Sequence, residues 1–131
     1  MSKLEAQKQE IIQILEQTPH IVFAVLYGSA TELAQCRELD VAIWVEPDAM
    51  SAREELAYAF AWADELTHRL HFPVDVRVIN CAPLAFRYHV SKGQLLLARD
   101  ADRYAQCLER TWDEYLDFKP IAMQYLREVA A

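Results

Sequence analysis

The chain is short, hydrophobic and acidic. Its 131 residues, 53% of them hydrophobic, suffice for one compact domain with a sizeable core and leave no room for a second. Because 20 aspartates and glutamates outnumber 13 lysines and arginines, the formal charge of −7 excludes a basic surface for free RNA or DNA and suits a basic protein partner.

The N-terminus and the cysteines indicate the cellular compartment of the protein. Residues 1–8 lack the apolar centre of a signal peptide, and no apolar run approaches the roughly 20 residues of a membrane span. Cys36, Cys81 and Cys107 are odd in number and lie outside any CxxC pattern, so we expect reduced thiols rather than a disulfide framework or a zinc site. We therefore expect a cytoplasmic protein with a single domain over residues 1–131.

A helix and a strand are predicted first. Ser2 and Glu5 form a capping box for a helix that runs to about Thr18, where Pro19 closes it. The apolar run at residues 21–27 is short, continuous and rich in β-branched and aromatic side chains, which is typical of a buried strand.

The first strand stops at Gly28-Ser29. Glycine has no Cβ, so the backbone can turn sharply there and approach a ligand closely. The Ser29 hydroxyl and the N–H groups that follow offer a place for phosphate oxygens. Good helix formers at residues 29–35 predict a short helix after the turn, with Ser29 as its cap.

A second strand and a long helix follow. The strand is predicted at residues 40–45 and opens with the carboxylate of Asp40, at the rim of the sheet. A second capping box, Ser51 with Glu54, begins a helix to about His71. Its apolar stripe of helical period comprises Leu56, Ala59, Phe60, Ala63, Leu66 and Leu70.

The third strand, at residues 74–79, carries its charged side chains on one face. Because side chains alternate along a strand, Asp75 and Arg77 project from the same side and three valines project from the other. With the valines inward, Asp75 faces a cleft. The rival interpretation is that Asp75 only pairs with Arg77.

The C-terminal half is predicted as helix, strand and helix. Pro83 suits the first turn of a helix through about Lys92, with Gly93 as its left-handed C-terminal stop. Residues 94–98 form a fourth, apolar strand. Asp100 then caps the last helix.

Pro120 is expected to kink or break that last helix. The alternation of strands and helices along the chain predicts an α/β (α+β) domain, with a small mixed sheet of about four strands flanked by helices.

The spacing of Gly28-Ser29, ten residues and Asp40 resembles the signature of the DNA polymerase beta nucleotidyltransferase superfamily, Gly-Ser, ten residues, then Asp-x-Asp. The resemblance implies a nucleotidyltransferase fold in which Gly28 and Ser29 bind the triphosphate of ATP. It also implies that Asp40 and Asp75 are catalytic and hold magnesium.

The second aspartate of the motif is replaced by Ala42. Two carboxylates still suit one nucleotide-bound magnesium, because this ion commonly takes only one or two from the protein. A site for two cations is expected to be degenerate, with adenylyltransferase activity weak or lost. Natural divergence and deliberate substitution both account for Ala42.

Segments of the C-terminal half narrow the resemblance to the minimal nucleotidyltransferases (MNT), which are small stand-alone antitoxins. These segments are residues 74–76, 79–83, 92–100 and 115–120, so the similarity covers nearly the whole chain. The resemblance implies transfer of AMP from ATP to a tyrosine of a partner toxin, an RNase of the HEPN type, which silences the toxin.

Two functions are therefore expected. The first is an antitoxin enzyme that uses ATP and Mg²⁺, which the intact Gly28-Ser29, Asp40 and Asp75 favour. The second is a catalytically inactive binding module that neutralises the toxin by complex formation, which Ala42 favours. The apolar helix from Tyr104 to Leu126 is the expected contact surface in a homo- or hetero-oligomer.

Overall fold

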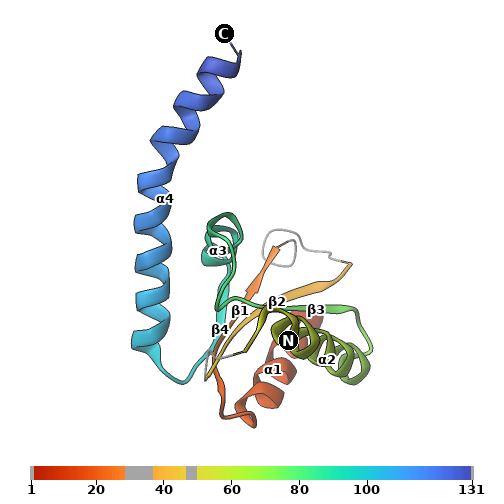
Figure 1. Ribbon diagram of the computed structural model, residues 1–131. Coiled ribbons are helices and arrows are strands. Elements are labelled where there is room, and N and C mark those ends of the chain that lie inside the picture. Colours follow the sequence, from red (N-terminus) through yellow and green to blue (C-terminus); the bar gives the residue numbers. More distant parts are fainter. Residues whose placement is uncertain (1, 29–36, 47–49, 131) are drawn as a thin grey trace.

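The computed structural model describes residues 2–28, 37–46 and 50–130, so the predicted helix at residues 29–35 lies outside the described residues. The described residues form α1 (Lys3–Glu16), β1 (Ile21–Tyr27), β2 (Leu39–Val45), α2 (Ala52–Leu70), β3 (Val74–Val78), α3 (Leu84–Ser91), β4 (Gln94–Ala98) and α4 (Ala101–Ala130) (Figure 1). In this part of the chain, no helix has the length and apolar character needed to span a membrane.

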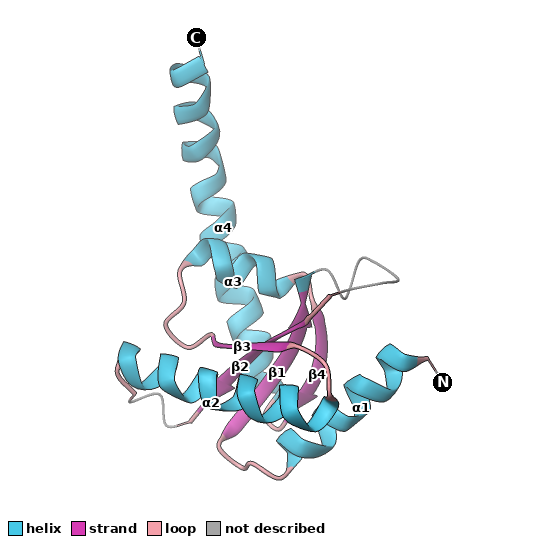
Figure 2. Cartoon of the chain, turned by 90° about the vertical axis from the view of Figure 1, so that its right-hand side faces the viewer, coloured by secondary structure: helices cyan, strands magenta, loops and turns pink. Residues whose placement is uncertain are grey.

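The strands form one mixed sheet in the order β3-β2-β1-β4 (Figure 2). β1 pairs antiparallel with β2 and with β4, and β2 pairs parallel with β3. All seven residues of β1 are buried, which agrees with its unbroken apolar run. The expected four-stranded mixed sheet flanked by helices is confirmed.

Each face of the sheet has its own apolar cluster. α1 and α2 cover one face, where Ile11, Leu15 and Leu66 pack against the strands. α3 and the first half of α4 cover the other face, where Val90 is buried and Phe86 and Tyr104 are partly buried (Figure 1). The predicted site lies on this second face, because the alternation along the strands places Asp40 and Asp75 there with Ala42 and Ile79.

The predicted caps of the first two long helices form. Ser51 Oγ accepts the N–H of Glu54 at 3.1 Å, and Glu54 Oε1 accepts the N–H of Ser51 at 3.1 Å, which completes the capping box of α2. At the start of α1, Ser2 Oγ accepts the N–H of Glu5 at 3.1 Å, but only this half of the predicted capping box forms, because Glu5 Oε1 accepts from Lys8 Nζ at 2.7 Å instead. These bonds explain why both helices begin where the sequence predicts.

Part of the predicted apolar stripe of α2 does not reach the core. Leu56 and Phe60 are 56% and 63% exposed, whereas Ala59 and Leu66 are buried. Trp62 packs against the core between them, so the buried face follows the i, i+3, i+7 spacing from position 59. The predicted stripe is wider than the buried face of α2, because Tyr58 and Trp62 pack against the core where Leu56 and Phe60 were expected to.

Gly93 does not act as a left-handed stop. Among the described glycines only Gly28 has a positive φ, and α3 ends at Ser91 with Lys92 as its right-handed C-cap. A Cβ on Gly93 would instead lie 2.4 Å from the carbonyl oxygen of Leu26. Glycine is needed there because β4 enters the sheet directly against the backbone of β1.

α4 runs without a break from Ala101 to Ala130. Asp100 caps it as predicted, since its Oδ1 accepts the N–H of Arg103 at 3.1 Å. Pro120 lies inside the helix, so of the two expected outcomes the break does not occur. Figure 1 shows the helix axis leaning over in the distal half. A long helix can continue past a proline with a bend, at the cost of one intrahelical hydrogen bond.

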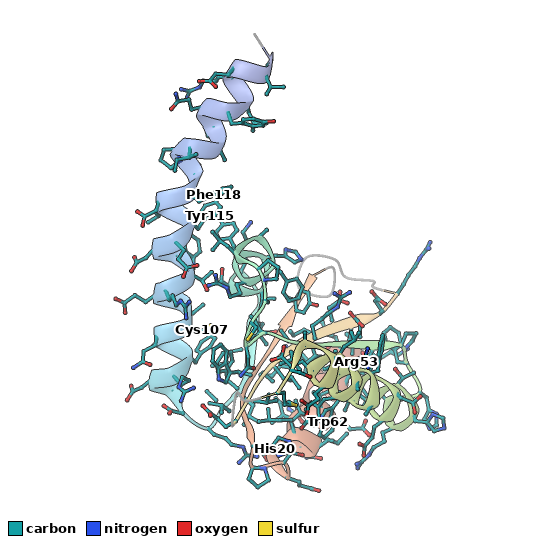
Figure 3. All side chains as sticks on the ribbon, in the orientation of Figure 1. His20, Arg53, Trp62, Cys107, Tyr115 and Phe118 are labelled. Carbon is teal, nitrogen blue, oxygen red and sulfur yellow. The ribbon has the colours of Figure 1, made fainter. Side chains whose placement is uncertain are left out.

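The distal half of α4 stands clear of the other elements (Figure 3). In the described part of this helix Thr111 is the only buried residue. Seven large apolar side chains beyond it are between 43% and 67% exposed: Leu116, Phe118, Ile121, Met123, Tyr125, Leu126 and Val129. We call these residues the α4 apolar surface.

Arg99 should contribute measurably to stability, because it caps the C-terminus of α1. Its Nε donates to the carbonyl oxygen of Ile21 at 2.9 Å, and its Nη2 donates to the carbonyl oxygens of Leu15, at 3.0 Å, and of Glu16. We expect Arg99→Ala to lower the free energy of unfolding by about 1–2 kcal/mol in urea titrations. Arg69→Ala, which removes only an exposed i,i+4 ion pair, is the control, and equal losses in both variants would contradict the capping role.

Candidate functional site

Three of the four predicted site residues meet where β1 ends and β2 begins. Asp40 pairs with Tyr27 of β1 on one side and with Asp75 of β3 on the other. Residues paired across neighbouring strands point to the same face, so both carboxylates project from the face that α3 borders. Ser29 falls outside the described residues.

Gly28 lies against the carboxylate of Asp40. Its φ is 80°, a left-handed conformation that glycine adopts without strain. A Cβ at this position would lie 2.6 Å from Asp40 Oδ2, so any other residue would press on the carboxylate. The geometry brings Gly28, Asp40 and Asp75 together, while their roles in binding and catalysis remain a prediction.

Burial and neighbouring acids raise the pKa of Asp40 to about 6. Desolvation is the largest cause, followed by the charge of Glu38, a hydrogen bond with Glu38 and the charge of Asp75, while Arg77 acts in the opposite direction. Crowded acids with a raised pKa are common where a protein binds a cation, although structural clusters show them too.

Asp40→Asn should stabilise the free protein above pH 6. The folded pKa of about 6 lies above the ordinary value of 3.8, so ionisation of Asp40 progressively weakens the fold as the pH rises from 3.8 to 6, has its full effect above pH 6 and has little effect below pH 3.8. We expect a gain of about 1 kcal/mol at pH 8, after allowing for solvent screening of this partly exposed group. Thermal unfolding at pH 4 and pH 8 measures it, and an equal change at both values would argue against the pKa shift.

Two neighbours of the site were missed in the sequence. Glu38 lies two residues before Asp40, and its negative charge helps to raise the pKa of Asp40. Tyr27 is 5% exposed and in register with Asp40, and burial followed by the charges of Asp40 and Asp75 raises its pKa. Glu38 could have been found from the alternation of side chains, but the position of Tyr27 requires the strand register.

α3 borders the site through aromatic contacts. The ring of Tyr27 lies edge-on to Phe86, at 5.5 Å between centroids, and to His89, at 5.6 Å. Arg87 of the same helix donates to Thr111 at 3.2 Å and to Glu114 at 2.5 Å, which ties α3 to α4. α3, which borders the site, is therefore held by β1 on one side and by α4 on the other.

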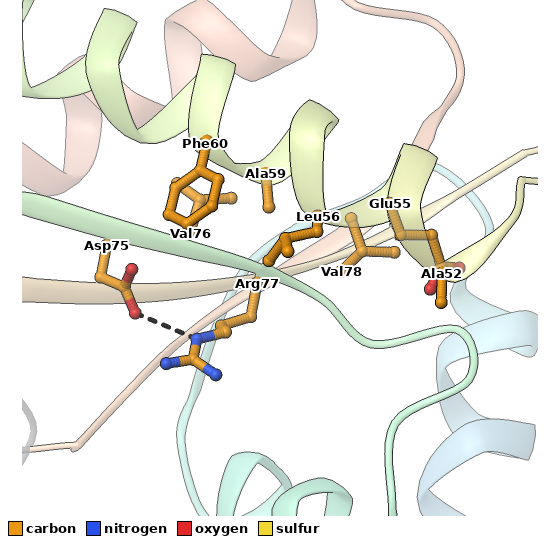
Figure 4. Close-up of a pocket in the computed structure, with 9 residues that line it drawn as sticks. All are labelled: Ala52, Glu55, Leu56, Ala59, Phe60, Asp75, Val76, Arg77 and Val78. Atoms are coloured by element: carbon orange, nitrogen blue, oxygen red, sulfur yellow. Dashed lines mark hydrogen bonds and ion pairs between the residues drawn. The ribbon is translucent and has the colours of Figure 1, made fainter.

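The rival pairing of Asp75 is present. Arg77 Nε donates to Asp75 Oδ2 at 3.3 Å, on the side of β3 that faces away from Phe60 of α2 (Figure 4). Both residues also line a cavity of about 260 Å³ between β3 and α2. The pair is exposed and weak in water, so it leaves Asp75 available to another cation.

Ala42 occupies a confined position. It is 1% exposed in the cluster with Val25 and Tyr27, and in the sheet it is paired with Val25 on β1 and with Arg77 on β3. The strand face therefore presents a methyl group beside a guanidinium where the motif has a second carboxylate.

The residues present fit one magnesium ion bound with a nucleotide. Asp40 and Asp75 supply hard oxygen donors from adjacent strands, and the missing Cβ of Gly28 lets the carboxylate of Asp40 pack closely against the backbone of the turn. Within the described ranges, no group of three or more potential ligands from His, Cys, Asp and Glu could hold a metal ion unaided. A nucleotide would have to supply further oxygen ligands.

Comparisons with known proteins agree with this geometry. The family described as "Polymerase beta, Nucleotidyltransferase" matches residues 9–102, whereas curated protein sequences give no significant match. Among solved structures, a chain from the tri-AMPylated Shewanella oneidensis HEPN toxin in complex with its MNT antitoxin superposes with a TM-score of 0.73. The two chains are 18% identical, and the alignment covers 98% of this chain and 99% of that one.

Two other solved structures show the same fold. A chain of the toxin–antitoxin MntA–HepT gives a TM-score of 0.72 at 18% identity, covering 97% of this chain and 99% of that one. A chain of a toxin–antitoxin with AMP-PNP gives 0.74 at 20% identity, covering 95% and 98%. With the family match extending over most of its length, this chain belongs to the polymerase beta nucleotidyltransferase family.

Proposed function

We propose that this protein is a cytoplasmic antitoxin of the MNT type, which binds ATP with magnesium and inactivates a HEPN-type RNase toxin by transferring AMP to it, at a low rate because Ala42 replaces the second aspartate of the motif. The observation that carries this proposal is the pairing of Asp40 with Asp75 in register, beside the left-handed Gly28. Similar chains of almost the same length have been solved as an MNT antitoxin–HEPN toxin complex and with AMP-PNP, which supports both the partner and the nucleotide.

Each residue has a definable task in this proposal. Asp40 and Asp75 would hold the ion that accompanies the triphosphate, and the backbone at Gly28 would approach the phosphates closely because no side chain intervenes. Ser29 is the predicted hydroxyl ligand of a phosphate. Magnesium would neutralise charge on the reacting phosphoryl group.

Thermal unfolding with ATP and magnesium tests the nucleotide site. ATP at about a hundred times its dissociation constant should stabilise the chain by about 2.7 kcal/mol. Asp75→Asn should abolish this gain, whereas Glu65→Gln, in an exposed ion pair on α2, should keep it. The nucleotide site is refuted if the unchanged chain gains nothing from ATP and magnesium.

A second candidate is neutralisation by association alone. Ala42 and the α4 apolar surface favour it, because a free helix that exposes seven large apolar side chains is suited to contact a partner. In this case the toxin would be held inactive without AMP transfer.

Substitutions on α4 test the contact surface that the second candidate requires. Ile121 and Tyr125 are 67% and 64% exposed and lie one turn apart, so Ile121→Ser with Tyr125→Ser should leave the fold and the ATP-dependent stabilisation intact. Affinity for the toxin, measured by calorimetry, should fall about a hundredfold if α4 is the contact. Asp117→Asn on the same helix is the control. Unchanged affinity in the double variant would exclude α4 as the contact surface.

A further inference from the structure

We propose that Arg77 is a phosphate-binding residue of the nucleotide site, next to position 42, where the motif has a second carboxylate. The proposal rests on the proposed nucleotide-binding function and assigns a further residue to it. Its basis is the juxtaposition of Ala42, Arg77 and Asp75 on one face of β2 and β3.

The register places Arg77 directly beside Ala42. The two residues are paired across the parallel strands, one step along from the pair of Asp40 with Asp75. Side chains paired in this way share a face, so a carboxylate at position 42 would stand next to the guanidinium. With alanine there, the three charged groups of the two strands are Asp40, Asp75 and Arg77, and they leave one net negative charge.

The guanidinium keeps donors for a ligand. Only its Nε is engaged, at 3.3 Å from Asp75 Oδ2, and within the described residues the two terminal nitrogens have no hydrogen-bond acceptor. The side chain is 61% exposed, and its Cζ lies 5.9 Å from the centroid of Phe86 on α3. Arginine binds phosphate through two parallel N–H groups. The two terminal nitrogens of Arg77 can supply such a pair.

The positive charge acts on the residues of the candidate site. Arg77 is the group that opposes the upward shifts in the pKa of both Asp40 and Tyr27, so its field extends to all three adjacent strands. In Figure 4 its side chain leaves β3 on the side away from the labelled residues of α2. A triphosphate held beside Asp40 and Asp75 would therefore lie within the field of Arg77.

A purely structural pairing predicts the opposite result on substitution. If Arg77 served only to neutralise Asp75, then its removal would free the carboxylate, and magnesium and ATP would bind as well or better. If Arg77 binds phosphate, its removal must weaken binding, because the triphosphate loses a bidentate donor. The sign of the change separates the two roles.

Calorimetric titration with two probes, ATP and inorganic tripolyphosphate, each with magnesium, tests the proposal. Arg77→Ala and Arg77→Gln should bind both probes at least tenfold more weakly, and Arg77→Lys should recover part of the loss. Arg69→Ala removes the same charge from an exposed ion pair on α2 and should stay within about twofold of the unchanged chain. Thermal unfolding of each variant verifies that it is folded.

Failure of this inference and failure of the proposed function give different results. If the unchanged chain binds neither probe, the nucleotide site is refuted and Arg77 loses its assigned role with it. If the unchanged chain binds ATP and Arg77→Ala binds it as tightly or more tightly, only the role of Arg77 is overturned. A tenfold loss shared by Arg69→Ala would also overturn it, since a general charge effect would then suffice.

Discussion

Ala42→Asp should increase the rate of AMP transfer to a HEPN-type toxin by roughly a thousandfold. A carboxylate at position 42 lies on the same strand face as Asp40, and one well-placed charge of this kind contributes several kcal/mol to stabilising a transition state. The measurement is incorporation of labelled AMP from ATP into the toxin, with magnesium, by this chain and by the variant.

The same substitution should weaken the fold. Ala42 is 1% exposed beside Val25 and Tyr27, so a larger and charged side chain must displace its neighbours, at about 1–3 kcal/mol. Ala42→Asn is the matched control, because it adds nearly the same volume without the charge. It should lose stability similarly and gain no activity. Fast labelling by the unchanged chain, or equal labelling by the Asp and Asn variants, would refute the interpretation that position 42 limits catalysis.

Gly93→Val should destabilise the protein by at least about 3 kcal/mol. A Cβ at this position would lie 2.4 Å from the carbonyl oxygen of Leu26 and 2.9 Å from Cγ1 of Val25, and backbone atoms of a central strand cannot move aside cheaply. The expected result in urea is a lower transition midpoint with unchanged slope.

Gly93→Asn tests the physical cause. Asparagine tolerates a left-handed backbone, so it would be accepted if Gly93 were needed for its φ. Because the requirement is close approach to β1, we expect Asn to be nearly as harmful as Val. Lys92→Ala, at the adjacent exposed position, should change the midpoint little.

The elements that could be predicted from sequence are those set by local chemistry. The apolar run at residues 21–27, the capping box at Ser51 and the serine cap at Ser2 depend on neighbouring residues alone, and these features formed as expected. The errors arose where tertiary contacts decide. The backbone of β1 determines the need for Gly93, and competition with Tyr58 and Trp62 for the core leaves Leu56 and Phe60 exposed.

The site was predictable in part for a related reason. The motif spacing identified Gly28, Asp40 and Asp75 as candidates, but their proximity depends on the parallel pairing of β2 with β3, which no local pattern encodes. The same register places Arg77 beside Ala42. The sequence showed Arg77 only as a possible partner of Asp75 on its own strand.

The order of strands in the sheet has a consequence for how the chain folds. β1 pairs locally with β2, but its other edge is covered only by β4, which lies far away in the sequence. Pairing between distant segments is slow, and until it occurs a wholly apolar strand presents open backbone donors and acceptors. We therefore expect refolding yields to fall with protein concentration, because intermolecular strand pairing competes with the late arrival of β4.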